Sequence, residues 1–276
     1  MAGAVISYRN EVDTAVLSGG ATVECPLTNL QVRQLSTTWR CNVSGATPTV
    51  VDFGAAKTIR LVALANTNAR HDQANTTKVE YSTNGIAWTD AGVTWAREGQ
   101  QPAKSKDIAG MLIAVLPTGI LARYWRITPA WSRVDAATYY EAGRLWLGDA
   151  IVVPDGVEAG WSRGFTDAGR LDFAAGLEAY EDPRPRARAI SFSFSALPPE
   201  IAYGFAESAA SSGTTPSFDG LQMEAGLTGE VIAVPVTRTP LWARRTGVYG
   251  HIADSWQIRH QAGPNYAADL RVIEER

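Results

Sequence analysis

The amino-acid sequence predicts a mainly β protein, with a jelly-roll β-sandwich followed by a smaller α+β domain of antiparallel strands and one short helix. Before about residue 150, short apolar segments alternate with polar residues at period two and are separated by turn-forming residues, which is typical of a sandwich. After a turn-rich stretch at 152–156 the pattern becomes mixed. We therefore expect two domains, residues 1–152 and 153–276.

The strands expected in the first domain are short and fairly evenly spaced. Ile59, Leu61 and Ala63 share one face of such a strand, and Arg60 lies on the other. Further strands are expected at 51–53, 78–81, 112–116, 124–128 and 144–147. Arg123 and Arg126 are expected to pair with acids on the surface of the sandwich.

The segment Val79–Gly92 (VEYSTNGIAWTDAG) is expected to form a hairpin of this sandwich. Asn84-Gly85 suits a type I′ turn, because both central residues of that turn need positive φ. We expect Trp88 to pack inward as part of the scaffold, so that the hairpin identifies the domain type without touching a ligand.

In the second domain, the segment 186–195 alternates bulky and small residues, which predicts a strand with one bulky face and one small face. Pro198-Pro199-Glu200 then offers a helix start, because proline suits the first turn and an acid suits its positive end. Ile201, Phe205 and Ala209 continue as one apolar stripe of that helix. Strands are expected at 229–236, 247–259 and 266–273.

Composition excludes several classes of protein. A net charge of −3 and a pI of about 5.7 do not provide the positive field that nucleic-acid binding requires. The longest apolar run, 111–122, contains Pro117 and Gly119 and is far shorter than the ~20 residues of a membrane helix, so we expect no membrane insertion.

The N-terminal residues and the cysteines point to synthesis in the cytoplasm. The first residues, MAGAVISYRN, lack the basic segment and the long apolar run of a signal peptide. Cys25 and Cys41 allow one disulfide, but in a chain made in the cytoplasm we favour two separate thiols.

Five motifs occur in an informative order in the first half: PLTNLQVRQLSTTWR (26–40), TVVDFGAAKTIRLVALAN (49–66), the Val79–Gly92 segment, ARYWRITPA (122–130) and AGRLWLGDA (142–150). This succession resembles the discoidin, or F5/8 type C, branch of the galactose-binding-like β-sandwiches, over roughly residues 5–150. The resemblance implies a jelly roll whose loops at one end bind glycans, lipids or proteins in some members, while other members are purely structural.

The whole chain also resembles distal-tail and baseplate proteins of long-tailed (siphovirus-like) bacteriophages. The residues behind this are Pro26–Leu30, Val51–Leu64, Ser191–Glu200 and the C-terminal strand at 269–275. The resemblance implies a virion structural protein of the tail tip, in which the second domain builds a threefold or sixfold ring. The first domain would then dock other tail and baseplate proteins or contact a glycan of the host surface.

Some polar and aromatic residues lie where this sandwich has loops. An exposed Trp39 beside Arg40 would stack on a sugar ring and bind its hydroxyls, although we favour Trp39 as a plug of the sandwich end. The candidate ligand-binding residues are Trp39, Arg40, Asn68, Arg70, His71, Trp131 and Arg133. No metal or cofactor is expected, because His71-Asp72 alone does not supply three or four converging ligands.

The second domain carries basic and aromatic residues of the types that interfaces favour, although an isolated run of charge is more often a solvated face. The candidate interface residues are Arg184, Arg186, Arg188, Trp242, Arg244 and Arg245.

Catalysis finds little support in the sequence. It contains no H-E-x-x-H, P-loop or C-x-x-C motif, and its three histidines are scattered. The leading hypothesis is the structural tail protein, and the alternative is a carbohydrate-binding module without catalytic activity. A glycan-cleaving enzyme with two distant carboxylates is a third and weaker hypothesis.

Overall fold

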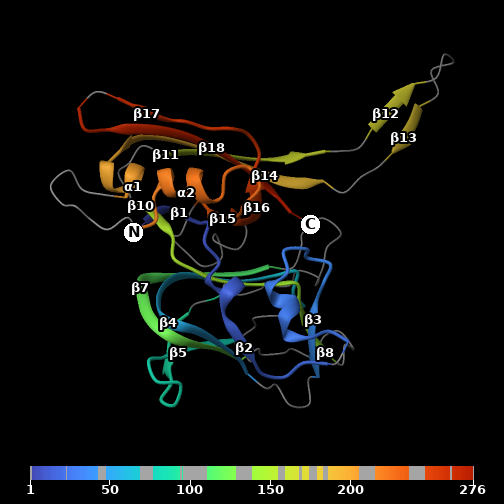
Figure 1. The fold of residues 1–276 in the computed structure, drawn as a ribbon. Helices are drawn as coiled ribbons and strands as arrows, with labels where there is room; N and C mark the ends of the chain where they lie inside the picture. Colours follow the sequence, from blue (N-terminus) through green and yellow to red (C-terminus); the bar gives the residue numbers. More distant parts are fainter. Residues whose placement is uncertain are drawn as a thin grey trace.

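The computed structural model describes residues 2–22, 24–42, 48–68, 77–93, 95, 111–128, 139–154, 159–167, 170–173, 179–182, 186–204, 215–235, 246–261 and 263–275. Its strands pair antiparallel in every described pairing, so the fold is mainly β as predicted. They form a sandwich unit and, stacked on it, a sheet unit (Figure 1).

The sandwich unit is built on two long strands, β4 (Thr49–Ala65) and β7 (Met111–Thr128), which pair along most of their lengths. The sheet is completed by β2 (Val16–Ser18), β5 (Lys78–Ser82), β6 (Thr89–Asp90) and β9 (Arg144–Gly148). A second sheet of β3 (Trp39–Asn42) and β8 (Tyr139–Ala142) covers the core, which two short 3₁₀ helices, η1 (Glu11–Thr14) and η2 (Leu27–Gln31), help to close.

The sheet unit is an eight-stranded antiparallel sheet in the order β10-β1-β15-β16-β18-β14-β11, with β17 paired to β18. Its strands are β1 (Ala2–Ser7), β10 (Ile151–Pro154), β11 (Ala159–Thr166), β14 (Ala187–Leu197), β15 (Glu230–Val234), β16 (Val248–Ile252), β17 (Ile258–His260) and β18 (Tyr266–Glu274). As predicted, β14 buries its bulky residues Ile190, Phe192 and Phe194.

The N-terminal strand does not belong with the sandwich. β1 lies between β10 and β15, with Val5 opposite Val152 on one side and Val234 on the other. The sandwich is therefore an insertion between β1 and β10, two neighbouring strands of the sheet unit. The division expected at residue 152 falls inside β10, and residues 2–7 join the second half, because Val5 and Ile6 are fully buried there.

Two short helices cover one face of the large sheet. α1 (Pro199–Tyr203) begins with proline in its first turn, as predicted, and ends at Gly204, whose φ of 80° permits the left-handed cap. α2 (Phe218–Glu224) was not anticipated; the Ser217 hydroxyl caps it by accepting from Gly220 N (3.0 Å). The rest of the predicted apolar stripe, Phe205 and Ala209, lies outside the described residues.

The predicted hairpin differs from its expected form. β5 and β6 pair through Tyr81 and Thr89, so the connection at 83–88 is longer than a two-residue type I′ turn. Gly85 has positive φ (74°) but Asn84 does not; the Asn84 side chain instead accepts from Ile86 N and Ala87 N.

Trp88 is half-buried, and the expectation that it packs inward is wrong. The Arg126 guanidinium lies 4.4 Å from the centre of its ring, so Trp88 stacks on the surface of the sheet. Arg126 also donates to Glu80 (2.7 Å), and Arg123 donates to Asp52 (2.7 Å), which confirms the predicted pairing of both arginines with acids.

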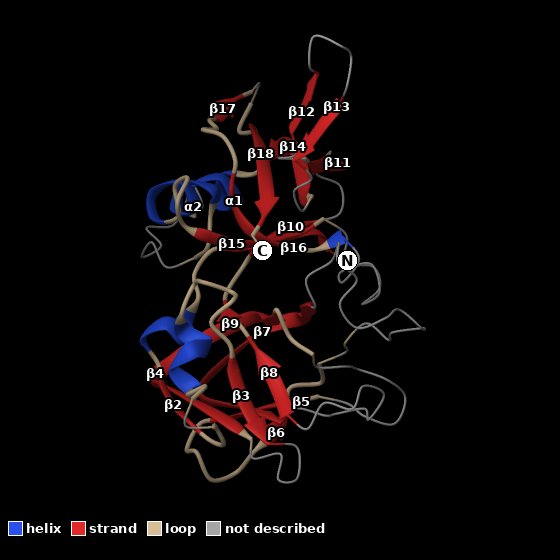
Figure 2. Cartoon of the chain, turned by 90° about the vertical axis from the view of Figure 1, so that its right-hand side faces the viewer, coloured by secondary structure: helices blue, strands red, loops and turns tan. Residues whose placement is uncertain are grey.

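A β-hairpin extends from the sheet unit as an arm. Its strands, β12 (Arg170–Phe173) and β13 (Ala179–Asp182), follow β11 and precede β14. They form a separate two-stranded sheet and pair only with each other in the described part of the chain. Both views show the arm pointing away from the rest of the molecule (Figures 1 and 2).

The two units meet in a continuous apolar seam. β4 turns Val62 and Leu64 into the core of the sandwich and Leu61 and Ala63 into the seam. The sheet unit contributes side chains of β1, β15 and β16 to the same cluster. The two units therefore pack against each other through one shared hydrophobic cluster. They are not two domains joined only by a linker.

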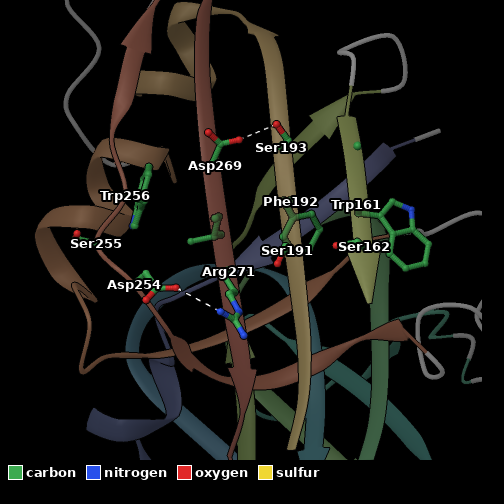
Figure 3. A pocket seen from close by; sticks show the side chains of 12 residues that line it. Trp161, Ser162, Ser191, Phe192, Ser193, Asp254, Ser255, Trp256, Asp269 and Arg271 are labelled. Atoms are coloured by element: carbon green, nitrogen blue, oxygen red, sulfur yellow. Dashed lines mark hydrogen bonds and ion pairs between the residues drawn. The ribbon is translucent and has the colours of Figure 1, made fainter. Parts of the chain in front are cut away.

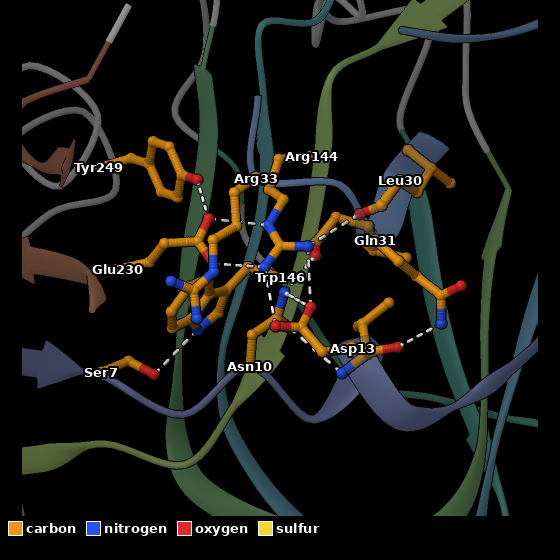
Figure 4. A network of polar contacts seen from close by, with 12 residues as sticks. Ser7, Asn10, Asp13, Leu30, Gln31, Arg33, Arg144, Trp146, Glu230 and Tyr249 are labelled. Atoms are coloured by element: carbon orange, nitrogen blue, oxygen red, sulfur yellow. Dashed lines mark hydrogen bonds and ion pairs between the residues drawn. The ribbon is translucent and has the colours of Figure 1, made fainter. Parts of the chain in front are cut away.

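A buried ionic network lies at the side of this seam (Figure 4). Arg144, on β9, is 0% exposed, and its Nε donates to Glu230 Oε1 of β15 (3.0 Å). Its two terminal nitrogens contact the Asp13 carboxylate at 2.9 and 2.8 Å. Tyr249 OH also donates to Glu230, and Arg33 Nε lies 3.3 Å from the same carboxylate. The network thus joins both units and balances two cations with two anions.

The environment keeps Arg144 charged and Tyr249 protonated. Although burial acts to lower it, the Asp13 and Glu230 carboxylates raise the pKa of Arg144 above its usual range, so this cation stays charged. Burial, reinforced by Glu230, raises the pKa of Tyr249, which keeps its hydroxyl as a donor. A buried charge with one partner removed is strongly destabilising, so the network couples the units.

We predict that Arg144→Met lowers the free energy of unfolding by about 3–5 kcal/mol, because it leaves the Glu230 and Asp13 carboxylates without their cation. Urea unfolding followed by tryptophan fluorescence measures this. The matched control is Arg186→Met, which removes an exposed ion pair to Asp167 and should change stability by less than about 0.5 kcal/mol. Equal effects of the two variants would contradict the role given to the network.

A second prediction concerns Asp149, which lies between β9 and β10 where the chain leaves the sandwich. Burial raises the pKa of its carboxyl, and the hydrogen bond from Ala150 N (2.8 Å) only partly opposes this. Because a raised carboxyl pKa means that stability falls as pH rises through it, Asp149→Asn should be more stable than the parent at about pH 7 and equal to it at about pH 3. A difference that is the same at both pH values, measured by urea unfolding, would contradict this.

Candidate functional site

Trp39 lies inside the sandwich. Its side chain is 2% exposed, and its Nε1 donates to Gly20 O (2.9 Å). Its ring centre lies 6.5 Å from that of Tyr140 on β8. This arrangement agrees with a plug of the sandwich end and leaves no exposed indole face for a sugar to stack on.

Arg40 and Asn68 come together on the outer face of β3 and β8. Arg40 Nε donates to Glu141 (3.2 Å), and its guanidinium lies 4.5 Å from the centre of the Tyr139 ring. The Asn68 amide donates to Tyr139 O (3.1 Å) and accepts from Glu141 N (2.9 Å). We call these four residues the β3–β8 cluster; it presents an aromatic ring and a half-exposed cation side by side.

The remaining sandwich candidates, Arg70, His71, Trp131 and Arg133, lie outside the described residues. The same holds for Arg184, Trp242, Arg244 and Arg245 of the sheet unit.

Arg186 and Arg188 have opposite environments although both belong to the same basic segment. Arg188 is 2% exposed; its Nε donates to Glu274 Oε1 (2.7 Å) and its backbone N donates to Oε2 (3.1 Å). It therefore belongs to the interior and cannot serve as the docking residue that was expected, because β14 turns the same face inward at Ile190 and Phe192. Arg186 is exposed and pairs with Asp167 at 2.9 Å.

A shallow groove of about 540 Å³ crosses the outer face of β11, β14 and β18 (Figure 3). It is lined mainly by Gly160, Ser162, Ser191, Ser193, Asp269 and Arg271, with 254–256 along one side. The floor is open because glycine and serine occupy the outward positions of two neighbouring strands. The volume is within the range of small-ligand sites.

The charges in this groove are paired. Asp269 accepts from Ser193 Oγ (2.7 Å) and from Arg259. Arg271 Nη1 lies 3.7 Å from Asp254 Oδ2. The groove therefore offers a neutral polar surface. The groove was not predicted from the sequence, although the small residues at every second position from Gly160 to Gly164 were a visible signal.

The described residues contain no group of three or more His, Cys, Asp or Glu side chains arranged to hold a metal ion. Cys25 and Cys41 are both free thiols. In the same part of the chain, no helix is long and apolar enough to cross a membrane.

Comparison with known proteins gives only structural likenesses. No family model and no curated protein matches the chain. One similar structure is the module CpGH89CBM32-6 of Clostridium perfringens. It is 15% identical over 50% of this chain and 98% of its own, with a TM-score of 0.37.

Two further solved structures give similar figures. The family 32 module of NanJ from C. perfringens, in complex with galactose, is 14% identical over 51% of this chain and 98% of its own, with a TM-score of 0.36. A chitosan-binding module from a chitosanase/glucanase of Paenibacillus sp. IK-5 is 17% identical over 51% and 98%, with a TM-score of 0.38. Likenesses of this size identify neither a family nor a shared ligand for this chain.

Proposed function

We propose that this chain is a structural subunit of a larger protein assembly and has no catalytic role of its own. The observation that carries the proposal is the arm. A two-stranded hairpin is marginally stable alone in water, yet β12 and β13 pair only with each other among the described residues. We infer that a neighbouring molecule stabilises the arm, which points away from the rest of the chain (Figure 1).

The joint between the two units supports the same proposal. A binding module that only needs to reach a ligand is served by a flexible linker. Here the sandwich is inserted between adjacent strands of the sheet and held by the seam and the Arg144 network. The sandwich therefore has one orientation relative to the sheet unit. A subunit of an ordered assembly requires such a constant orientation.

The specific assembly that we propose is the tail tip of a long-tailed bacteriophage, as the sequence resemblance implies. The sheet unit would contact other copies in a closed threefold or sixfold ring, and the sandwich would dock other tail and baseplate proteins. The protein would be made in the host cytoplasm and incorporated into the virion. The comparisons with known proteins do not bear on this assembly, which rests on the sequence motifs and on the arm.

Light scattering across a concentration series tests the proposal. We expect a mass of three times 29.6 kDa, or a multiple of that, which persists on dilution because a ring closes all of its contacts. A single-chain mass at every concentration, together with failure to be retained by purified tail-tip proteins, would contradict it.

A second candidate function is carbohydrate binding by the sandwich, and the β3–β8 cluster favours it. Tyr139 and Arg40 supply a ring and a guanidinium of the kind that contact sugar rings and their hydroxyls. Several of the solved structures that resemble half of this chain are carbohydrate-binding modules by name, and one of them holds galactose.

If the cluster binds sugar, Arg40→Ala should weaken binding to a responding glycan by at least about tenfold in calorimetric titration. Arg126→Ala is the matched control, because Arg126 also stacks on an aromatic ring and pairs with an acid, but on another strand. Equal losses in both variants, or no glycan bound by the parent protein on an array, would rule this function out.

A further inference from the structure

β11 is an edge strand that is open to solvent along its length. It pairs with β14 over eight residues without a break in register, and no described strand pairs with its other side. Residues 160–165 are all exposed. Exposed edges of this kind present unpaired backbone N–H and C=O groups to any chain that adds a strand.

The sequence of β11 carries few of the features that normally protect an edge. Proline, lysine and bulges block strand addition in natural sheets, and β11 (AGWSRGFT) has none of them. The opposite edge of the same sheet differs. β10 has four residues, ends at Pro154, and its pairing with β1 shifts register between Ala2 and Ala4. Of these two edges, β11 is therefore the less protected.

The two faces of β11 are different. Trp161, Arg163 and Phe165 lie on the face that Phe192 shares, while the other face carries glycine and serine. Trp161 is 39% exposed and Phe165 is 56% exposed, and the Arg163 guanidinium lies 5.7 Å from the centre of the Phe165 ring. Figure 3 shows the Trp161 ring projecting past β11, away from β14. Trp and Arg are the residue types that carry most binding energy at interfaces.

We propose that β11 pairs antiparallel with β11 of a second copy of this chain, with Ser162 on the twofold axis. A twofold axis between two antiparallel strands stands perpendicular to the sheet, so residues of the same face must oppose each other. With Ser162 opposite Ser162, Trp161 of each copy faces Arg163 of the other. The interface then holds two cross-strand cation–π pairs on one face and only small residues on the other.

The charge of Arg163 selects this register. The other twofold register of comparable overlap is centred on Arg163 and places the two guanidinium groups directly opposite each other, which destabilises a strand pair. In the register centred on Ser162, each guanidinium lies between Phe165 of its own chain and Trp161 of the second copy. The strand is thus complementary to itself, which favours a second copy over an unrelated strand.

The pairing also gives the arm a neighbour. Thr166, the last residue of β11, leads toward the arm. In an antiparallel pair this end lies beside the first residues of β11 in the second copy. Each arm would then start at the interface and run past the other copy.

This inference rests on the proposed function in one respect, that copies of the chain contact each other through the sheet unit. An isologous contact joins copies in pairs and does not by itself close a ring. The number of copies in the assembly should therefore be even, with the β11 contacts joining two rings of three or six copies.

Cysteine cross-linking tests the register directly. In a Cys25→Ser background, Ser162→Cys places two thiols opposite each other on the axis, so mild oxidation should convert most of the protein into a covalent dimer on a non-reducing gel. Met223→Cys, at an 80% exposed position on α2, is the control and should remain a monomer on the gel. A Ser162→Cys protein that cross-links no better than the control would overturn the inference.

A charge variant tests the same contact without oxidation. Ser162→Lys puts two like charges on the axis while changing an exposed residue, so light scattering should show half the mass of the parent protein. Met223→Lys should leave the mass unchanged. If the parent protein is oligomeric and Ser162→Lys leaves its mass unchanged, the β11 contact is wrong and the assembly uses another surface. If the parent protein is monomeric throughout, both this inference and the proposed assembly fail.

Discussion

The contact of Arg144 with Glu230 and Asp13 is the interaction on which the rest of the structure depends. A fully buried guanidinium is costly unless its charge is balanced, and the balancing acids come from opposite sides of the joint: Asp13 precedes the sandwich strands and Glu230 lies on β15. Neither unit satisfies this cation alone. The network therefore holds the sandwich in one orientation. A tilt of one unit would separate the buried charges of Arg144 and Glu230, and their burial keeps water from replacing the lost partner.

The apolar seam extends the contact between the two units beyond the ionic network. β4 and β7 are apolar on both faces over part of their length, so one face completes the sandwich and the other covers the sheet unit. The insertion between β1 and β10 then returns the chain to the strand beside the one it left. Because the two units are packed together in this way, contacts that hold the free edge and the arm of the sheet unit in place also determine the orientation of the sandwich.

Much of the fold could be predicted from the sequence because it depends on local pattern. Period-two alternation located parts of β4 and identified the bulky face of β14 that is buried. β4 and β7 each run continuously through what was expected to be two short strands. The joint could not be predicted in this way. The continuous apolar run at Leu61–Ala65 was a signal that both faces of a strand are covered, but it does not say by what. Arg144 and Glu230 are 86 residues apart, and nothing local to either residue identifies the other. At the candidate sites, the sequence supplied residue types, and only the tertiary structure showed that Trp39 is buried while Trp161 is exposed.

The central claim, that the two units form one body, is tested most directly by differential scanning calorimetry of the intact protein. A shared core and a buried ionic joint predict a single transition in which the calorimetric and van't Hoff enthalpies agree. Two separated transitions, one for the sandwich and one for the sheet unit, would show that the joint does not couple them and would contradict the account.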